Sequence, residues 1–310
     1  MMSKRKAPAR NPLPDMERMM KEVQRLIGSQ NFSSIEETNA FLNEQLQSGS
    51  LDPGKLPGPD ANASALDRAQ EMIWDACEAP THKKAIALAK KALKISKDCA
   101  DAWVFLAENE ADSHQAALFL YEQGIQAGER ALGPEAFESY RGVFWGAHET
   151  RPYMRARAGL GKTLWMLGRH EESVAHWEAM LELNPHDNQG IRELLFASYL
   201  MEEMLPEAAA LLKKFPNDAS CDMVYGTVLL EWMRGDKEAS RTAMKKALKG
   251  NPHVVEFLLG RKSLPKDPPD MIAWGGESEA AEHVRGWCSL WAEYPDAIAA
   301  LAKVAKVPTS

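Results

Sequence analysis

Apolar residues recur every three or four positions along most of the chain, which is the spacing of amphipathic helices. Alternating β-branched runs are almost absent, and Ala, Leu, Glu, Lys and Met, which favour helices, dominate. A first helix is predicted over about residues 14–27, ended by Gly28. A second is predicted to begin at Ser33 or Ser34, where Glu37 can complete a capping box. The pattern predicts an all-α fold.

Two segments near the start of the chain lack this periodicity. Residues 1–12 are basic and have no apolar stretch behind them, so we expect a disordered leader rather than a signal peptide; its role stays open. Residues 50–65 are rich in Pro and Gly and are predicted to be a linker. The linker separates an N-terminal helical segment, residues 13–49, from the rest of the chain.

Beyond the linker, small residues recur at a nearly constant interval. The landmarks are Ala85, Ala117, Ser173, Ala208 and Ser240, separated by 32, 56, 35 and 32 residues. A helical hairpin of about 34 residues gives such an interval, because small residues let its two helices approach closely. The wide step indicates an insertion at about residues 128–150.

The clearest unit carries Leu160-Gly161, Ser173, Trp177 and Asn184-Pro185 at the places that such a hairpin requires. In these residues the chain resembles the tetratricopeptide repeat family over residues 66–262. The runs at residues 150–157 and 184–192 are also similar to a bacterial group of such proteins, distantly related to the suppression-of-tumorigenicity family. That narrower resemblance implies no particular chemistry.

The repeat pattern stops before residues 263–310. The Pro-rich run at residues 263–269 cannot lie inside a helix. A helix predicted over about residues 277–293 then places Val284, Trp287, Leu290 and Trp291 on one face. Because a solenoid needs a terminal cap, we expect capping helices here. The predicted fold is a tetratricopeptide-like helix-turn-helix solenoid with an N-terminal helical extension and a C-terminal helical cap.

Composition narrows the class of protein. A net charge of −7 is a poor match to nucleic-acid binding, and 45% hydrophobic with 26% charged residues is typical of soluble globular proteins. The four cysteines are too scattered for a disulfide framework, which favours a cytoplasmic location. No apolar run reaches the roughly 20 residues that span a bilayer.

The resemblance implies that the first helix of each hairpin lines a concave groove. Partner-binding residues expected there are Arg155, Lys162, Gln189, Arg192, Tyr199, Tyr225 and Trp232. Arg155, Lys162 and Arg192 are expected to share one surface and to favour an acidic segment or the C-terminus of a partner. The alternative is that these side chains pair with acids of their own protein or pack on the next repeat.

The insertion at residues 128–150 contains four aromatic residues, Phe137, Tyr140, Phe144 and Trp145. Long insertions in repeat proteins often carry recognition. Filling of the core is favoured here, because exposed Phe and Trp would promote aggregation. An insertion that packs on its own protein in this way could also occupy the groove.

These observations favour a non-catalytic adaptor that binds a protein or peptide segment in its groove. The alternative is a regulatory or small-ligand-sensing module whose groove is closed by its own residues, and an enzyme is a remote third. The histidines are dispersed and no catalytic triad has a local signature, so we expect neither a metal nor a cofactor.

Residues 156–163, ending in Gly161-Lys162-Thr163, match a relaxed phosphate-loop string. The string lies inside a predicted helix, whose N–H groups are bonded to carbonyls four residues back and cannot cradle phosphates. We therefore expect no ATP binding by calorimetry at millimolar ligand. A magnesium-dependent affinity that is lost in Lys162→Ala would contradict this and favour the enzyme.

Overall fold

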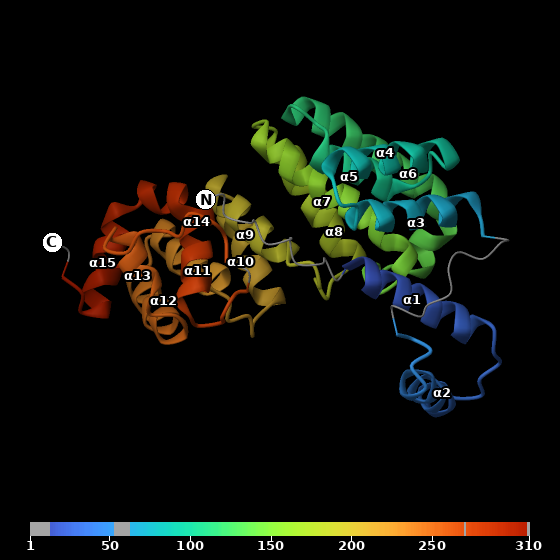
Figure 1. Ribbon diagram of the computed structural model, residues 1–310. Coiled ribbons are helices and arrows are strands. Elements are labelled where there is room, and N and C mark those ends of the chain that lie inside the picture. Colours follow the sequence, from blue (N-terminus) through green and yellow to red (C-terminus); the bar gives the residue numbers. More distant parts are fainter. Residues whose placement is uncertain (1–12, 53–62, 270, 309–310) are drawn as a thin grey trace, which may run out of the picture. The chain divides into compact units, whose positions relative to one another are not determined.

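The computed structural model describes residues 13–52, 63–269 and 271–308 (Figure 1). The predicted basic leader, residues 1–12, and residues 53–62 of the predicted linker lie outside the described residues. The described residues form α-helices and no strand, which confirms the all-α prediction. The protein divides into two compact units between Gln189 and Gly190, and each is described by itself.

Unit 1 begins with two helices ahead of its repeats, α1 (Leu13–Gly28) and α2 (Ile35–Gln47). The predicted start of the second helix is confirmed: the hydroxyl oxygen of Ser34 accepts the N–H of Glu37 at 3.2 Å. The Glu37 carboxylate in turn accepts the N–H of Ser33 at 2.8 Å. No residue of α2 is buried, so this helix adds little to the core.

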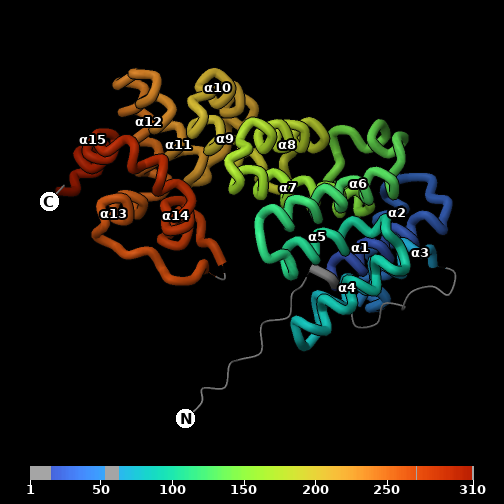
Figure 2. Tube along the Cα trace, turned by 90° about the horizontal axis from the view of Figure 1, so that it is seen from above, coloured from blue at the N-terminus to red at the C-terminus, as the bar shows by residue number. Residues whose placement is uncertain are grey.

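Three helical hairpins make up the body of unit 1. They are α3 (Ala65–Cys77) with α4 (His82–Ile95), α5 (Ala100–Asn109) with α6 (His114–Ser139), and α7 (Arg151–Met166) with α8 (His170–Leu183). Each first helix packs on its partner, and α5 also packs on both α3 and α7, as the tube in Figure 2 traces. This nearest-neighbour stacking confirms the tetratricopeptide-like architecture.

The small residues of the repeat have a direct role in the third hairpin. The hydroxyl of Ser173 donates to the carbonyl of Gly161 at 2.7 Å, which joins α8 to the backbone of α7. A Cβ atom at Gly161 would lie 2.5 Å from the indole nitrogen of Trp177. Ser240 makes the equivalent bond, to the carbonyl of Val228 at 3.3 Å, in unit 2. Small residues therefore recur at these positions because the two helices of each hairpin approach closely there.

The predicted insertion is an extension of α6 and a loop that returns to α7. Gly133, at φ 69°, breaks the helical backbone just before Pro134. The loop ends in the short 3-10 helix η2 (His148–Thr150). Phe144 is fully buried, and its ring centroid lies 5.2 Å from that of Phe137 and 5.9 Å from that of Tyr153. Phe144 therefore fills the core, the role that the sequence favours, while Phe137, Tyr140 and Trp145 are half-buried.

Unit 2 holds two further hairpins and three terminal helices. They are α9 (Ile191–Met201) with α10 (Leu205–Lys214), α11 (Cys221–Met233) with α12 (Lys237–Gly250), then α13 (Val254–Leu258), α14 (Glu277–Glu293) and α15 (Pro295–Ala305). The predicted helix over residues 277–293 is α14, and its predicted apolar face is buried. This helix packs on α11 and α13.

Buried polar contacts also fix α14 in place. The carboxylate of Glu279 accepts the N–H of Cys221 at 3.0 Å and the side-chain amide of Asn251 at 3.0 Å. The indole of Trp291 donates to Nε2 of His283 at 3.2 Å, so Nδ1 of that ring carries the proton. Nδ1 then donates to Asp222 at 2.7 Å. The sequence gives no sign of this network, since its members are far apart along the polypeptide.

Two glycines of unit 2 provide a matched test of the packing. A Cβ atom at Gly226 would lie 2.5 Å from the buried ring of Phe196 and 2.7 Å from Trp287, whereas one at Gly286 would meet nothing within 4 Å. We expect Gly226→Ala to lower the free energy of unfolding by about 1–3 kcal/mol. Gly286→Ala, in the interior of α14, should raise it by about 0.5–1 kcal/mol.

Thermal unfolding followed by circular dichroism checks both variants. Equal effects of the two substitutions would contradict the close approach of α11 to α9 and α14.

Candidate functional site

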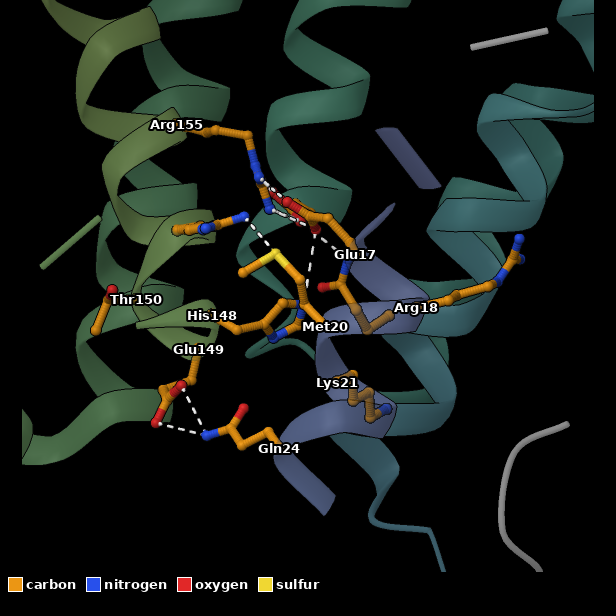
Figure 3. A network of polar contacts seen from close by, with 12 residues as sticks. Glu17, Arg18, Met20, Lys21, Gln24, His148, Glu149, Thr150 and Arg155 are labelled. Carbon is orange, nitrogen blue, oxygen red and sulfur yellow. Dashed lines mark hydrogen bonds and ion pairs between the residues drawn. The ribbon is translucent and has the colours of Figure 1, made fainter. Parts of the chain in front are cut away.

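Helix α1 contacts the first helices of two hairpins in unit 1, α3 and α7. It packs on α3 and on η2, and Glu17 points toward Arg155 of α7 (Figure 3). We call the surface that receives it the inner surface; its polar members are Asp67, Glu71, Asp75 and Glu78 around α3, Asp101 of α5, and Arg155 of α7. The surface that the sequence predicts to bind a partner therefore already holds, in unit 1, a helix of the same protein.

The centre of this contact is the guanidinium of Arg155. It donates to both oxygens of Asp101, at 2.8 and 2.6 Å, and to Glu17 at 2.6 Å. Glu17 and Asp101 are 8% and 6% exposed, so both carboxylates are buried and need this partner. Burial by itself lowers the pKa of Arg155, but the two carboxylates raise it above its ordinary value. The group is a permanent cation clamped between two acids.

Two cations of α1 face the acidic residues of α3. Arg18 donates to Asp75 at 2.8 Å and contacts Glu71 and Glu78 at 3.3 Å each. Lys21 lies 3.0 Å from Asp67. Both cations also lie over the ring of Trp74, 5.6 and 5.5 Å from its centroid. Since the acids recur at helical spacing, they form one negative stripe along α3.

The far end of α1 meets the loop before α7. The amide of Gln24 donates to Glu149 at 3.3 Å, and Arg151 contacts the sulfur of Met20 at 3.1 Å (Figure 3). Nε2 of His148 is buried and makes no hydrogen bond among the described residues; its nearest acid, Glu17, is 3.9 Å away. Burial, followed by the nearby cations Arg151 and Arg155, outweighs Glu17 and lowers the pKa of His148, which favours the neutral ring.

A second feature of unit 1 is a hollow of about 360 Å³ next to Arg155. Arg155, Lys162 and Gln189 line it together with Glu108 and Tyr121. Lys162 is exposed and makes no ion pair in the part of the protein that the structure describes, and Oε1 of Gln189 is buried without a described hydrogen-bond partner. Three of the predicted partner-binding residues thus line one hollow.

The other four predicted residues belong to unit 2. Arg192 pairs with Asp218 and lies 5.4 Å above the ring of Phe215. Tyr199 and Tyr225 are buried, and the Tyr225 hydroxyl donates to the carbonyl of Asn251 at 2.6 Å. Trp232 is half-buried. Arg192 is therefore engaged by an acid of its own unit, and both tyrosines pack in the core of unit 2.

The phosphate-loop string lies within α7, as expected from the sequence. The hydroxyl of Thr163 donates to the carbonyl of Gly159 at 2.8 Å, an ordinary contact of a helical threonine. Among the described residues no group of three His, Cys, Asp or Glu side chains is placed to hold a metal ion. No described helix has the length and apolar character needed to cross a membrane.

Sequence reasoning missed the docking of α1 on the inner surface. Two signals were available: Glu17, Arg18 and Lys21 cluster in one helix, and Asp67, Glu71, Asp75 and Glu78 follow one face of another. Charge patterns of this kind are usually solvated faces, so they do not identify a partner by themselves.

Comparison with known proteins extends these observations. No family model matches the sequence. It is 29% identical over 248 residues to the human protein "Suppressor of tumorigenicity 7 protein-like", a match that covers 71% of this chain and 42% of the human one. The mouse "Suppressor of tumorigenicity 7 protein" is 27% identical over 213 residues, 61% of this chain and 36% of its own length. The protein thus spans less than half the length of these curated relatives.

The fold was also compared with solved structures. The crystal structure of YrrB, described as a TPR protein with an unusual peptide-binding site, matches 60% of this chain and 84% of its own, with a TM-score of 0.42 and 19% identity.

The charge cluster around Arg192 predicts a pH dependence of stability. Burial, followed by the charge of Asp222, raises the pKa of Glu193 from its ordinary value of 4.5 to about 6. The folded state therefore holds this proton more tightly than the unfolded state, and this carboxyl loses stability as the pH rises from about 4.5 to 6. We expect Glu193→Gln to raise the free energy of unfolding by about 1–2 kcal/mol at pH 7.5.

Urea unfolding at pH 7.5 and pH 4 measures this effect. The gain should nearly vanish at pH 4, where the native carboxyl is protonated; an equal gain at both pH values would contradict the assignment.

Proposed function

We propose that this protein is a non-catalytic interaction adaptor that binds a protein or peptide segment on the inner surface of its helical repeats. The observation that carries the proposal is the docked helix α1, since the inner surface of unit 1 already holds a helical segment through charged contacts. A surface with this chemistry suits recognition of a polypeptide. The fold is that of an interaction module, and the adaptor role is our inference from this contact.

The hollow beside Arg155 is the part of the surface that we assign to the partner. Its exposed cation is Lys162, and the Gln189 oxygen, which has no described hydrogen-bond partner, adds an acceptor for a backbone or side-chain N–H. Arg155 itself is committed to Glu17 and Asp101. We therefore propose that an acidic segment or the C-terminus of a partner is recognised mainly through Lys162, and we leave Arg192 out of this site.

A second candidate is the regulatory module with a self-closed groove. It is favoured by one observation, namely that the segment on the inner surface belongs to the same protein and is α1 rather than the insertion. The two candidates are compatible if α1 and a partner take turns. The cytoplasmic location is proposed from the dispersed cysteines and not from the fold.

A charge reversal at Lys162 tests the adaptor proposal. We expect the full-length protein to bind a subset of acidic peptides on an array, and Lys162→Glu to weaken this binding about tenfold or more, the effect of one charge-assisted contact of about 1.5–3 kcal/mol. The melting temperature should hardly change, because Lys162 is exposed and has no ion pair among the described residues.

Lys83→Glu is the matched control, since Lys83 is an exposed lysine of α4 outside the hollow. Binding constants from fluorescence anisotropy decide the outcome. Equal losses in both variants, or no acidic peptide bound by the wild type, would contradict the proposal.

A further inference from the structure

Helix α1 is attached to the inner surface in a way that permits release. Between residues 15 and 28 one side chain is buried, and it is the carboxylate of Glu17. Met16 is 46% exposed, and the other apolar side chains of this stretch are half-buried. The contact therefore has no fully buried apolar side chain within residues 15–28, whereas permanent interfaces resemble a divided hydrophobic core.

Two ion pairs of this contact are partly exposed to water and weak individually. The side chains of Asp75 and Lys21 are 61% and 33% exposed, so water screens their pairs with Arg18 and Asp67. Exposed pairs contribute little to stability, typically under about 1 kcal/mol each. Several such pairs select a matching helix without fixing it permanently.

The pair of Arg155 with Asp101 stays satisfied when α1 leaves. Arg155 keeps both bonds to Asp101, which also accepts the amide of Gln70 at 2.9 Å. Loss of Glu17 therefore leaves no unpaired buried charge among the described residues of α5 and α7, and the receiving geometry is set within the hairpins. Release of α1 would leave the same charges for another helix with the same pattern.

We propose that α1 is an exchangeable internal ligand and that the partner of this surface is an amphipathic helix with the same polar pattern. That pattern is a carboxylate followed directly by Arg, with Lys three residues later and a side-chain amide three residues after that, as in Glu17, Arg18, Lys21 and Gln24. The carboxylate of the partner helix pairs with the part of the Arg155 guanidinium that Glu17 vacates. Its two cations pair with the acidic residues along α3. This inference rests on the proposed adaptor function and adds a second class of partner, a helix that binds where α1 lies rather than an acidic segment in the hollow beside Lys162, together with its regulation.

If α1 is exchangeable, it competes with a partner helix for the inner surface of its own molecule. Residues 29–64 connect α1 to α3, so α1 acts at the effective concentration of a short linker, on the order of millimolar. A helix supplied in trans must displace it, and its apparent affinity is lowered accordingly. Weakening α1 in cis should therefore strengthen binding in trans.

The test uses the full-length protein and a fluorescein-labelled peptide with the sequence of residues 13–28. The release variant carries Arg18→Glu and Lys21→Glu, which place two acids against the acidic stripe of α3. We expect it to bind the peptide at least tenfold more tightly than the wild type, measured by fluorescence anisotropy. A peptide that itself carries Arg18→Glu should not bind.

The control variant carries Lys83→Glu and Lys91→Glu, the same charge change at exposed lysines of α4. Its affinity for the peptide should equal that of the wild type. Hydrogen exchange measured by mass spectrometry should show faster exchange over residues 15–28 in the release variant and unchanged protection over residues 82–183.

Three results would overturn the proposal. Peptide affinity unchanged in the release variant would make α1 a permanent structural helix, and so would loss of protection throughout unit 1. A wild-type dimer that dissociates in the release variant would assign the surface to α1 of a second copy. A negative result for exchange of α1 does not contradict the adaptor function, because binding of acidic peptides through Lys162 is measured independently of α1.

Discussion

The organisation of unit 1 depends on the ion pairs that the Arg155 guanidinium makes with Glu17 and Asp101. The guanidinium joins three elements that are distant in sequence, because α1 supplies Glu17, α5 supplies Asp101 and α7 supplies the arginine. Two buried acids without a cation would not ionise at low cost. The planar fork of arginine satisfies both carboxylates at once, so repeat packing and N-terminal docking meet at one residue.

A cation on the first helix of a hairpin is available to a partner only if no acid of the same protein already pairs with it. Arg155 and Arg192 each face acids of their own unit, whereas Lys162 is exposed beside a hollow. Cations that the repeat register groups together as groove residues therefore differ in availability. What distinguishes them is whether a neighbouring helix offers a carboxylate within reach, and a position in the repeat does not specify that.

Most of the fold follows from the sequence. The start of α2, the span of α14 and the burial of Phe144 in the insertion correspond to local signals, namely a capping box, an apolar face and a cost of exposure. The site could be predicted only in part. The expectation that Arg155, Lys162, Gln189 and Arg192 line one groove depends on repeat register, but the pairing of Glu17 with Arg155 joins residues 138 apart in the sequence. No periodicity encodes such a contact, because it depends on how a separate helix folds back.

The buried carboxylate of Glu279 has a consequence for how long this array can grow. In a repeat stack, the exposed face of the last hairpin is where another hairpin would be added. Here α14 covers α11, and Glu279 accepts the first N–H of that helix together with the side chain of Asn251 and the N–H of Gly275. A duplicated hairpin inserted after α12 would have to replace both this apolar face and these three acceptor contacts. The C-terminal helices thus act as a terminator of repeat number, because duplication of a hairpin at this end of the gene would disrupt the cap.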